Sequence, residues 1–225
     1  MYCSNIDPSI VALQHGVFAR LGYTVEQQNA TGHQHGEWLE SVLRNLVQDD
    51  DEVLFVDIDA IPLTSSVVKR AFAAANSGRL FGLAQTANHL EDSSLIYAGP
   101  SFMSVKKATW LAAGQPSLRP DRQNDVAMQF TRCAIRASIE VELVYPTYVC
   151  HPCWRLADRG WFGHGTFYGD LELFHLFESR YAREHGLVGL FGQVAASVIR
   201  GETISLDHLA ALPHIGQQSP WTSSK

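Results

Sequence analysis

Apolar and polar residues alternate along the first part of the chain with the spacing of strands and helices in turn. Five elements are expected there in this order: a strand at Tyr2–Asn5, a helix at Ser9–Leu21 that Pro8 opens, a strand at Tyr23–Gln27, a helix with an apolar stripe from Trp38 to Leu46, and a strand at Val53–Leu63. This order is typical of a parallel sheet with right-handed crossovers. We therefore predict an α/β fold, a three-layer sandwich around a mostly parallel sheet.

The rest of the chain continues with helices and strands that polar loops connect. The expected elements are a helix after Ser65, a strand at Leu80–Ala84, a turn at Ala98–Ser101, a strand at Phe102–Val105, helices at Lys106–Ala113 and Asp125–Ala134, strands at Ile139–Val149 and Leu171–Phe177, and helices at Leu187–Ile199 and Leu206–Leu212. Cys150–Gly169 shows no periodicity and is expected to be irregular. Because no linker divides the chain, we predict a single domain over residues 1–225.

The strand at Val53–Leu63 carries two acidic residues separated by one. Because side chains alternate along a strand, Asp57 and Asp59 share one side while Ile58 points into the core. Two carboxylates at the end of a buried strand are costly to desolvate unless a cation neutralises them, and in open α/β sheets ligands bind at this edge. The pair therefore indicates a divalent metal site, although Asp-x-Asp also occurs as an ordinary strand cap or turn.

Composition and charge exclude several classes of function. The chain has 225 residues, of which 46% are hydrophobic and 18% charged, as in globular proteins. It shows no apolar run that could span a membrane and no signal peptide at its start, so we expect a cytoplasmic protein without a transmembrane segment. A net charge of −6 with scattered Lys and Arg argues against a nucleic-acid partner. Four unevenly spaced cysteines do not suggest a disulfide scaffold.

A histidine late in the chain is expected to complete the metal site. Aspartate oxygens suit Mg²⁺ or Mn²⁺, and an added imidazole favours Mn²⁺. His175 is the first candidate, although a buried, hydrogen-bonded core histidine fits its apolar surroundings in Leu171–Phe177 equally. His164 is the alternative ligand, because Gly163 and Gly165 leave it free to turn toward a site.

Two further motifs carry candidate chemistry. Asp125 opens a predicted helix after a long loop, where the helix N-terminus would keep it ionised as a general base requires, and where a capping role is also ordinary. Cys150-His151-Pro152-Cys153 resembles half of a zinc site. No second pair of ligands at suitable spacing completes it, so we do not expect zinc there.

Together these features resemble the nucleotide-sugar-dependent glycosyltransferases of the GT-A fold. The matching features follow one another along Tyr2–Arg180: the strand-helix start, Asp57-Ile58-Asp59, the turn Gly99-Pro100-Ser101-Phe102 ahead of a strand, Asp125 at a helix start, and a late histidine. The resemblance implies a GT-A-like domain with a nucleotide- and metal-binding half over residues 1–105, an acceptor half over residues 106–185 and a helical tail over residues 186–225.

The resemblance also implies roles for the residues near the donor. In that family the Asp-x-Asp pair binds a divalent metal that clamps the diphosphate of the sugar donor. Carried over to this sequence, Asp57, Asp59 and His175 would bind Mn²⁺ or Mg²⁺, and Asn5 and Asp7 would lie near the nucleoside.

On the acceptor side, Asp125 would activate the acceptor hydroxyl if the enzyme inverts. Substrate contacts are expected from four further residues: Gly99, Pro100, Ser101 and His164. The resemblance thus implies an enzyme, a glycosyltransferase of the hexosyltransferase type, that moves a sugar from a nucleoside-diphosphate sugar to a glycan or another hydroxyl-bearing acceptor.

Two other functions remain open from the sequence. Phosphatases that resemble haloacid dehalogenase also end a buried strand in Asp-x-Asp and would use Asp57 as the nucleophile. They need a later acidic pair for magnesium, for which Asp170 and Glu172 are a weak match. A non-catalytic sugar-nucleotide-binding homologue would keep the same ligands without turnover.

Overall fold

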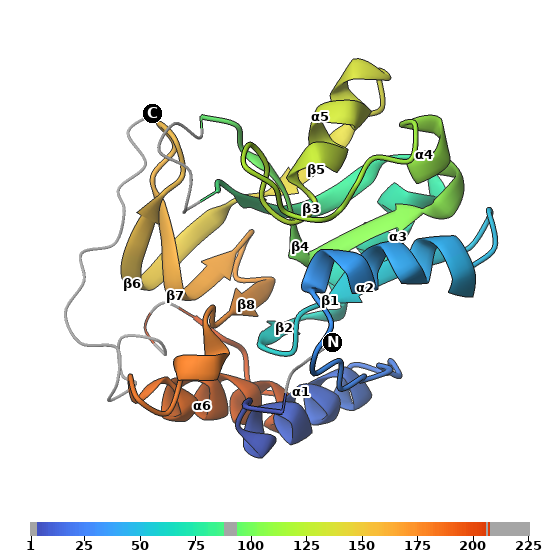
Figure 1. Cartoon of the computed structure of the whole chain (residues 1–225). Coiled ribbons are helices and arrows are strands. Elements are labelled where there is room, and N and C mark those ends of the chain that lie inside the picture. Colours follow the sequence, from blue (N-terminus) through green and yellow to red (C-terminus); the bar gives the residue numbers. More distant parts are fainter. Residues whose placement is uncertain (1–3, 88–93, 206, 208–225) are drawn as a thin grey trace.

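The strands of the protein form two sheets (Figure 1), as seen in a computed structural model that describes residues 4–87, 94–205 and 207. The first sheet has the strand order β1-β4-β3-β5, with β1 at Glu52–Val56, β3 at Leu80–Gln85, β4 at Tyr97–Lys106 and β5 at Val141–Val144. β4 is antiparallel to both β1 and β3, and β3 is parallel to β5. β1 therefore lies at an edge of this sheet.

The second sheet is antiparallel throughout. Its order is β2-β8-β7-β6, with β2 at Ala60–Pro62, β6 at Pro146–Arg155, β7 at Trp161–Tyr168 and β8 at Leu173–His175. Because β1 and β2 are separated by the segment 57–59 alone, the acid pair lies where the chain passes from one sheet to the other.

Helices pack against both sheets. They are α1 at Pro8–Arg20, α2 at His35–Ser41, the π-helix η1 at Val42–Leu46, α3 at Ser65–Asn76, α4 at Lys107–Ala112, α5 at Met128–Arg136, the 3₁₀ helix η2 at Ser179–Tyr181 and α6 at Leu187–Arg200. α1 and α6 lie side by side below the second sheet (Figure 1), where Ile10, Phe174 and Val194 belong to one apolar cluster. Burial of such side chains is the main stabilising contribution to this layer.

The first sheet is covered on both faces. Leu39 of α2, Trp110 of α4 and Phe130 of α5 share one apolar cluster with Phe55 of β1, and Val67 of α3 belongs to a cluster on the other face. That second cluster also contains residues of β7 and β8, so α3 joins the two sheets in one core.

The α/β class is confirmed, but the mostly parallel sheet is wrong, because most strand pairs here are antiparallel. The expected strand Tyr23–Gln27 has no regular structure. Of the expected strand Tyr2–Asn5, Asn5 lies in a turn, and residues 2 and 3 lie outside the described residues. Gln27 instead donates from Nε2 to the carbonyl oxygen of Val11 on α1. The predicted central strand, Val53–Leu63, is therefore split into β1 at a sheet edge and β2 in the other sheet.

Two loop assignments and one strand assignment are also corrected. The expected turn at Ala98–Ser101 is part of the continuous strand β4, where a Cβ on Gly99 would lie 2.3 Å from Oε1 of Gln85, so this glycine allows close approach rather than a turn. Ile139–Val149 divides into β5 and β6 in different sheets, and Cys150–Gly169 contains most of the β6–β7 hairpin. The expected helix Leu206–Leu212 lies outside the described residues except for Asp207.

Candidate functional site

The acid pair is held in a turn that three elements fix in place. The N–H of Asp57 donates to the carbonyl oxygen of Ser101 on β4 at 2.9 Å, and the N–H of Ala60 donates to that of Asp57 at 3.0 Å. Gln14 of α1, which is buried, donates from Nε2 to the carbonyl oxygens of Asp57 at 2.6 Å and Ala60 at 3.0 Å. Ile58 is buried in the core, as predicted, so both carboxylates face the opposite way.

His175 joins the acid pair through strand pairing. Ala60 of β2 lies opposite His175 of β8, and this register brings Nε2 of His175 to 3.3 Å from Oδ1 of Asp59. One ligand atom each from Asp57, Asp59 and His175 lie within 4.8 Å of one another, so this cluster could hold a metal ion. His175, rather than His164, therefore lies with the acids.

The two carboxylates have different environments. Asp59 is buried, which opposes its ionisation, but the adjacent His175 and hydrogen bonds that include one from the Ser179 N–H lower the pKa of this carboxyl. Asp57 is more exposed, and its Oδ1 lies 3.2 Å from Nε2 of His35 at the start of α2. The site thus combines one buried and one accessible acid.

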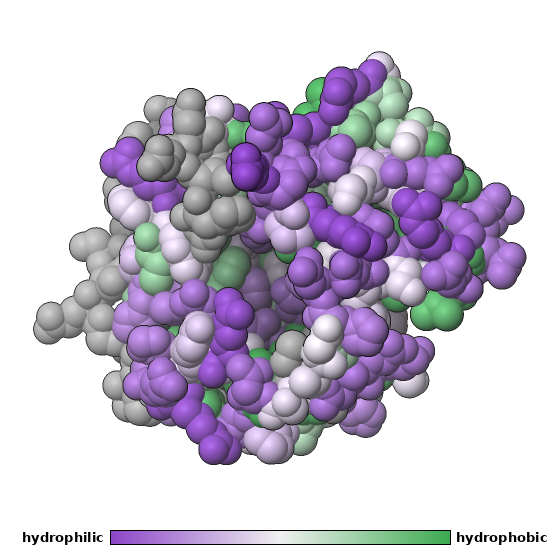
Figure 2. Space-filling view, viewed as in Figure 1, coloured by the Kyte–Doolittle hydropathy of each residue, from purple (hydrophilic) through white to green (hydrophobic). Residues whose placement is uncertain are grey.

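The acids line a cavity of about 190 Å³, which we call the acid pocket. Its lining residues are His35, Asp57, Asp59, Gln85, Pro100, Ser101, Asp125, Val126, His175, Phe177 and Glu178. Figure 2 shows this face of the molecule hollowed between the two sheets, with mainly hydrophilic residues around the hollow.

Two buried polar atoms of the acid pocket residues have no hydrogen-bond partner within the described chain. They are Oγ of Ser101 and Nδ1 of His175. Buried polar atoms are nearly always paired in folded proteins, so we expect water or a bound group to satisfy these two. Both atoms thus fit a polar ligand in the acid pocket.

Asp125 reaches the acid pocket from a position outside a helix. The predicted helix Asp125–Ala134 begins only at Met128, so the expected stabilisation of Asp125 by a helix N-terminus is wrong. Its Oδ2 instead accepts a hydrogen bond of 2.8 Å from the Tyr97 hydroxyl, which in turn accepts one of 2.7 Å from Nε2 of Gln85. Burial and the Asp125 carboxylate raise the pKa of Tyr97 well above its usual value, so this phenol stays a hydrogen-bond donor.

Several predicted site residues lie away from the acid pocket. Asn5 is exposed in a turn, and Asp7 caps α1 by accepting from the Ser9 N–H and pairs with Arg183. These hydrogen bonds, with that from Arg183 the strongest, lower the pKa of Asp7 to about 2. Neither residue is among those that line the pocket, so the donor roles expected for them remain predictions.

The predicted substrate residues divide in the same way. Pro100 and Ser101 line the acid pocket, whereas Gly99 is not among its lining residues. His164 is held in strand β7 and contacts Glu178 and Cys153 instead of the acid pair. Its flanking glycines therefore do not turn it into the metal cluster.

Some lining residues were missed from the sequence. His35, Gln85 and Glu178 reach the acid pocket from three separate elements or loops. Gln85 carried a weak signal, because it is the polar residue that follows the apolar run of a predicted strand. His35 and Glu178 arrive only through tertiary packing, which local patterns do not encode.

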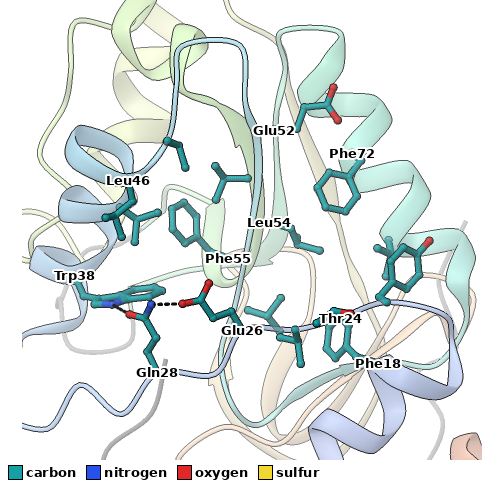
Figure 3. A pocket seen from close by; sticks show the side chains of 17 residues that line it. Phe18, Thr24, Glu26, Gln28, Trp38, Leu46, Glu52, Leu54, Phe55 and Phe72 are labelled. Atoms are coloured by element: carbon teal, nitrogen blue, oxygen red, sulfur yellow. Dashed lines mark hydrogen bonds between the residues drawn. The ribbon is translucent and has the colours of Figure 1, made fainter.

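A larger cavity of about 390 Å³ runs along the free edge of β1 (Figure 3). Trp38, Leu46 and Phe72 contribute to its mainly apolar lining, and Gln28 links the Trp38 Nε1–H to the carboxylate of Glu26. It contains no histidine or aspartate, so it offers less chemistry than the acid pocket.

Comparison of the chain with protein-family models, curated proteins and solved structures gave no match. Among the described helices, none combines the length and apolar character needed to cross a membrane. The site geometry is accordingly the basis for a functional conclusion.

Proposed function

We propose that the protein is a metal-dependent glycosyltransferase that takes its sugar from a nucleoside diphosphate. The single observation that carries this proposal is the convergence of Asp57, Asp59 and His175 in a pocket that Asp125 also lines. The resemblance to GT-A enzymes rests on these motifs, since the sheet pairing found here differs from the one expected for that fold.

The donor atoms fit a divalent transition metal. Ligands at about 2.1 Å from a metal lie no more than about 4.2 Å apart, so ligand atoms within 4.8 Å need only small rotations to share one ion. Two carboxylates and an imidazole favour Mn²⁺ over Mg²⁺. When bound, such an ion supplies positive charge that stabilises the departing diphosphate.

The residues of the chain would act around that centre. The volume of about 190 Å³ is below the range of whole-ligand pockets, about 300–1,000 Å³, so the acid pocket suits the diphosphate and reacting sugar rather than the entire donor. Ser101 Oγ would hydrogen-bond the donor, and Asp125 would accept the proton of the acceptor hydroxyl in an inverting reaction. Tyr97, which donates to Asp125, would hold that carboxylate in position.

The phosphatase alternative receives little support from the geometry. Its magnesium would need the later acids Asp170 and Glu172 near Asp57. Glu172 instead pairs with Arg70 of α3 at 2.9 Å, and neither acid lines the acid pocket. The non-catalytic alternative is tested by whether the protein releases a nucleoside diphosphate from a sugar nucleotide.

A screen of common sugar nucleotides for nucleoside-diphosphate release with Mn²⁺ tests the proposal. We expect slow release to water that requires the metal, and loss of release in Asp57→Asn and Asp59→Asn proteins that still fold. Hydrolysis of phosphate monoesters with Mg²⁺, without release from any sugar nucleotide, would replace the proposal by the phosphatase alternative. Binding without release by either route would identify a non-catalytic protein.

A further inference from the structure

Cys153 occupies an unusual position on the outer strand of the second sheet. In the pairing of β6 with β7 the register shifts between Pro152 and Trp154, so Cys153 lies at a β-bulge, and it is exposed. Bulges re-aim side chains and are frequent beside active sites. The thiol is therefore accessible and displaced from the regular alternation of the strand.

The facing strand leaves room for this thiol. A Cβ on Gly163 would lie 2.6 Å from the backbone nitrogen of Cys153 and 3.1 Å from its Sγ, and 2.2 Å from the carbonyl oxygen of His151. Any larger residue at this position would push the bulge away. The glycine thus allows Cys153 to approach β7 closely.

His164 lies between the Cys153 thiol and a carboxylate. Its Nδ1 is 3.6 Å from Sγ of Cys153, and its Nε2 is 2.9 Å from Oε2 of Glu178. A carboxylate only accepts hydrogen bonds, so Nε2–H donates to Glu178 and Nδ1 is left as an acceptor. The thiol also lies 3.3 Å from the carbonyl oxygen of His151, to which it donates, so its proton must turn from that oxygen to Nδ1 before the transfer. Trp154 packs edge-on against the imidazole, with the ring centroids 5.7 Å apart.

Glu178 is presented to His164 by a strained stretch of backbone. Phe177 has φ of 60° and Glu178 has φ of 50°, in the left-handed region that non-glycine residues rarely adopt. Such residues cost about 1–3 kcal/mol each and cluster at functional sites. Glu178 also lines the acid pocket, together with Asp57, Asp59 and His175. The group formed by Cys153, His164 and Glu178 therefore borders that pocket.

We propose that Cys153, His164 and Glu178 form a second, nucleophilic site that takes acyl groups from activated esters. A nucleophile, a base within reach of its proton and a third group that orients the base are the elements of covalent acyl transfer. This site is distinct from the metal cluster, and its activity does not depend on the proposed glycosyl transfer.

The step balances with the residues present and the ester. Nδ1 of His164 takes the proton of the Cys153 thiol, Sγ bonds to the carbonyl carbon, and the carbon–oxygen bond of the ester breaks. The alcohol leaves with the proton that His164 returns, and a thioester remains on Cys153. Water then attacks the thioester with the same base, which releases a carboxylic acid and restores the thiol.

The chain provides its own comparison thiols. Burial raises the pKa of Cys150 to about 12, so this thiol is inert. Cys133 on α5 is partly exposed, and the neighbour at its Sγ is the Arg136 guanidinium at 3.5 Å rather than an imidazole. Cys133 is therefore a comparison thiol that solvent reaches but that has a guanidinium, not an imidazole base, beside it.

Acetylation by 4-nitrophenyl acetate, read from the mass of each cysteine-containing peptide, tests the proposal. The assay contains EDTA, so that no metal ion bound by Asp57, Asp59 and His175 contributes to the reaction. We expect Cys153 to be acetylated about 100-fold faster than Cys133, with a matching burst of nitrophenolate that Cys153→Ser abolishes. Equal rates for the two thiols would overturn the proposal.

The role of the base is tested separately from folding. His164→Ala should slow acetylation of Cys153 about 100-fold, and added imidazole should restore it, which no structural defect would allow. Glu178→Gln should slow acetylation in the otherwise unchanged protein but leave the imidazole-rescued rate of His164→Ala unaltered, because Glu178 acts by positioning His164. An acetylation rate of Cys153 that is the same in the native protein and in His164→Ala would refute the assignment.

Discussion

Gln14 links the helix α1 to the turn that carries the acid pair, which makes Gln14→Met a sharp test of how the site is built. Methionine keeps the size and shape of the side chain but removes the donor that serves the carbonyl oxygens of Asp57 and Ala60. Each hydrogen bond contributes about 0.5–1.5 kcal/mol, and a buried acceptor left unpaired costs more. The Ala60 N–H still donates to the carbonyl oxygen of Asp57, so only the carbonyl oxygen of Ala60 loses its side-chain donor without that replacement. We therefore expect a loss of about 2–3 kcal/mol in the free energy of unfolding.

That loss corresponds to a melting temperature lower by about 4–12 °C for a chain of this size. Thermal and urea unfolding in EDTA measure it without a contribution from bound metal. His15→Met, at an exposed position of the same helix, is the control and should change the free energy of unfolding by less than about 0.5 kcal/mol. A loss for Gln14→Met no larger than that of the control would refute the view that α1 fixes the acid turn. Mn²⁺ affinity should fall as well, because the acids lose their fixed spacing.

Three further predictions concern parts of the structure around the site. Asp7→Ala should lower the free energy of unfolding by about 1 kcal/mol, because the helix cap is lost. The pKa of Asp7 is about 2 in the folded protein, below its value in the unfolded chain, so this loss should be full at pH 5 and fade as the pH falls through 2. Urea unfolding at several pH values measures it. Tyr97→Phe should cost about 1–2 kcal/mol, because the buried phenol links Gln85 to Asp125, and an unchanged urea midpoint would contradict this. Gly163→Ala should destabilise the protein by about 1–3 kcal/mol, because the added methyl group clashes with β6. Gly192→Ala inside α6, where the nearest atom is 3.9 Å from the added Cβ, should stabilise it by about 0.5–1 kcal/mol. If both variants changed the melting temperature in the same direction, the close spacing of β6 and β7 would be wrong.

Local signals in the sequence predicted several of the helices and the cluster of Asp57, Asp59 and His175. Pro8 begins α1, and the apolar spacing after Ser65 and from Leu187 predicted α3 and α6 close to their bounds. The acid pair was found because charge at the end of an apolar run is unusual whatever the fold around it. His175 was the first candidate for the third ligand, and the pairing of β8 with β2, which the sequence did not predict, brings it to the acid pair.

Strand partners and directions were not predictable in the same way. Whether β1 pairs with Tyr23–Gln27 or with β4 depends on residues far apart in sequence, and an apolar run alone does not distinguish a central strand from an edge strand that helices cover. The same reason applies to His35 and Glu178, which reach the acid pocket only once both sheets are assembled. Gly99 was read as a turn because glycine serves turns and close contacts alike.

Isothermal titration of Mn²⁺ into the metal-free protein tests the central claim most directly. We expect one Mn²⁺ per chain, bound tightly by the native protein and by His164→Ala, and bound much more weakly by Asp59→Asn and His175→Ala, each of which removes one of the three clustered ligands. Unchanged Mn²⁺ binding in Asp59→Asn and His175→Ala, or no binding to the native protein with or without a nucleoside diphosphate, would contradict the assignment of this cluster as a metal site.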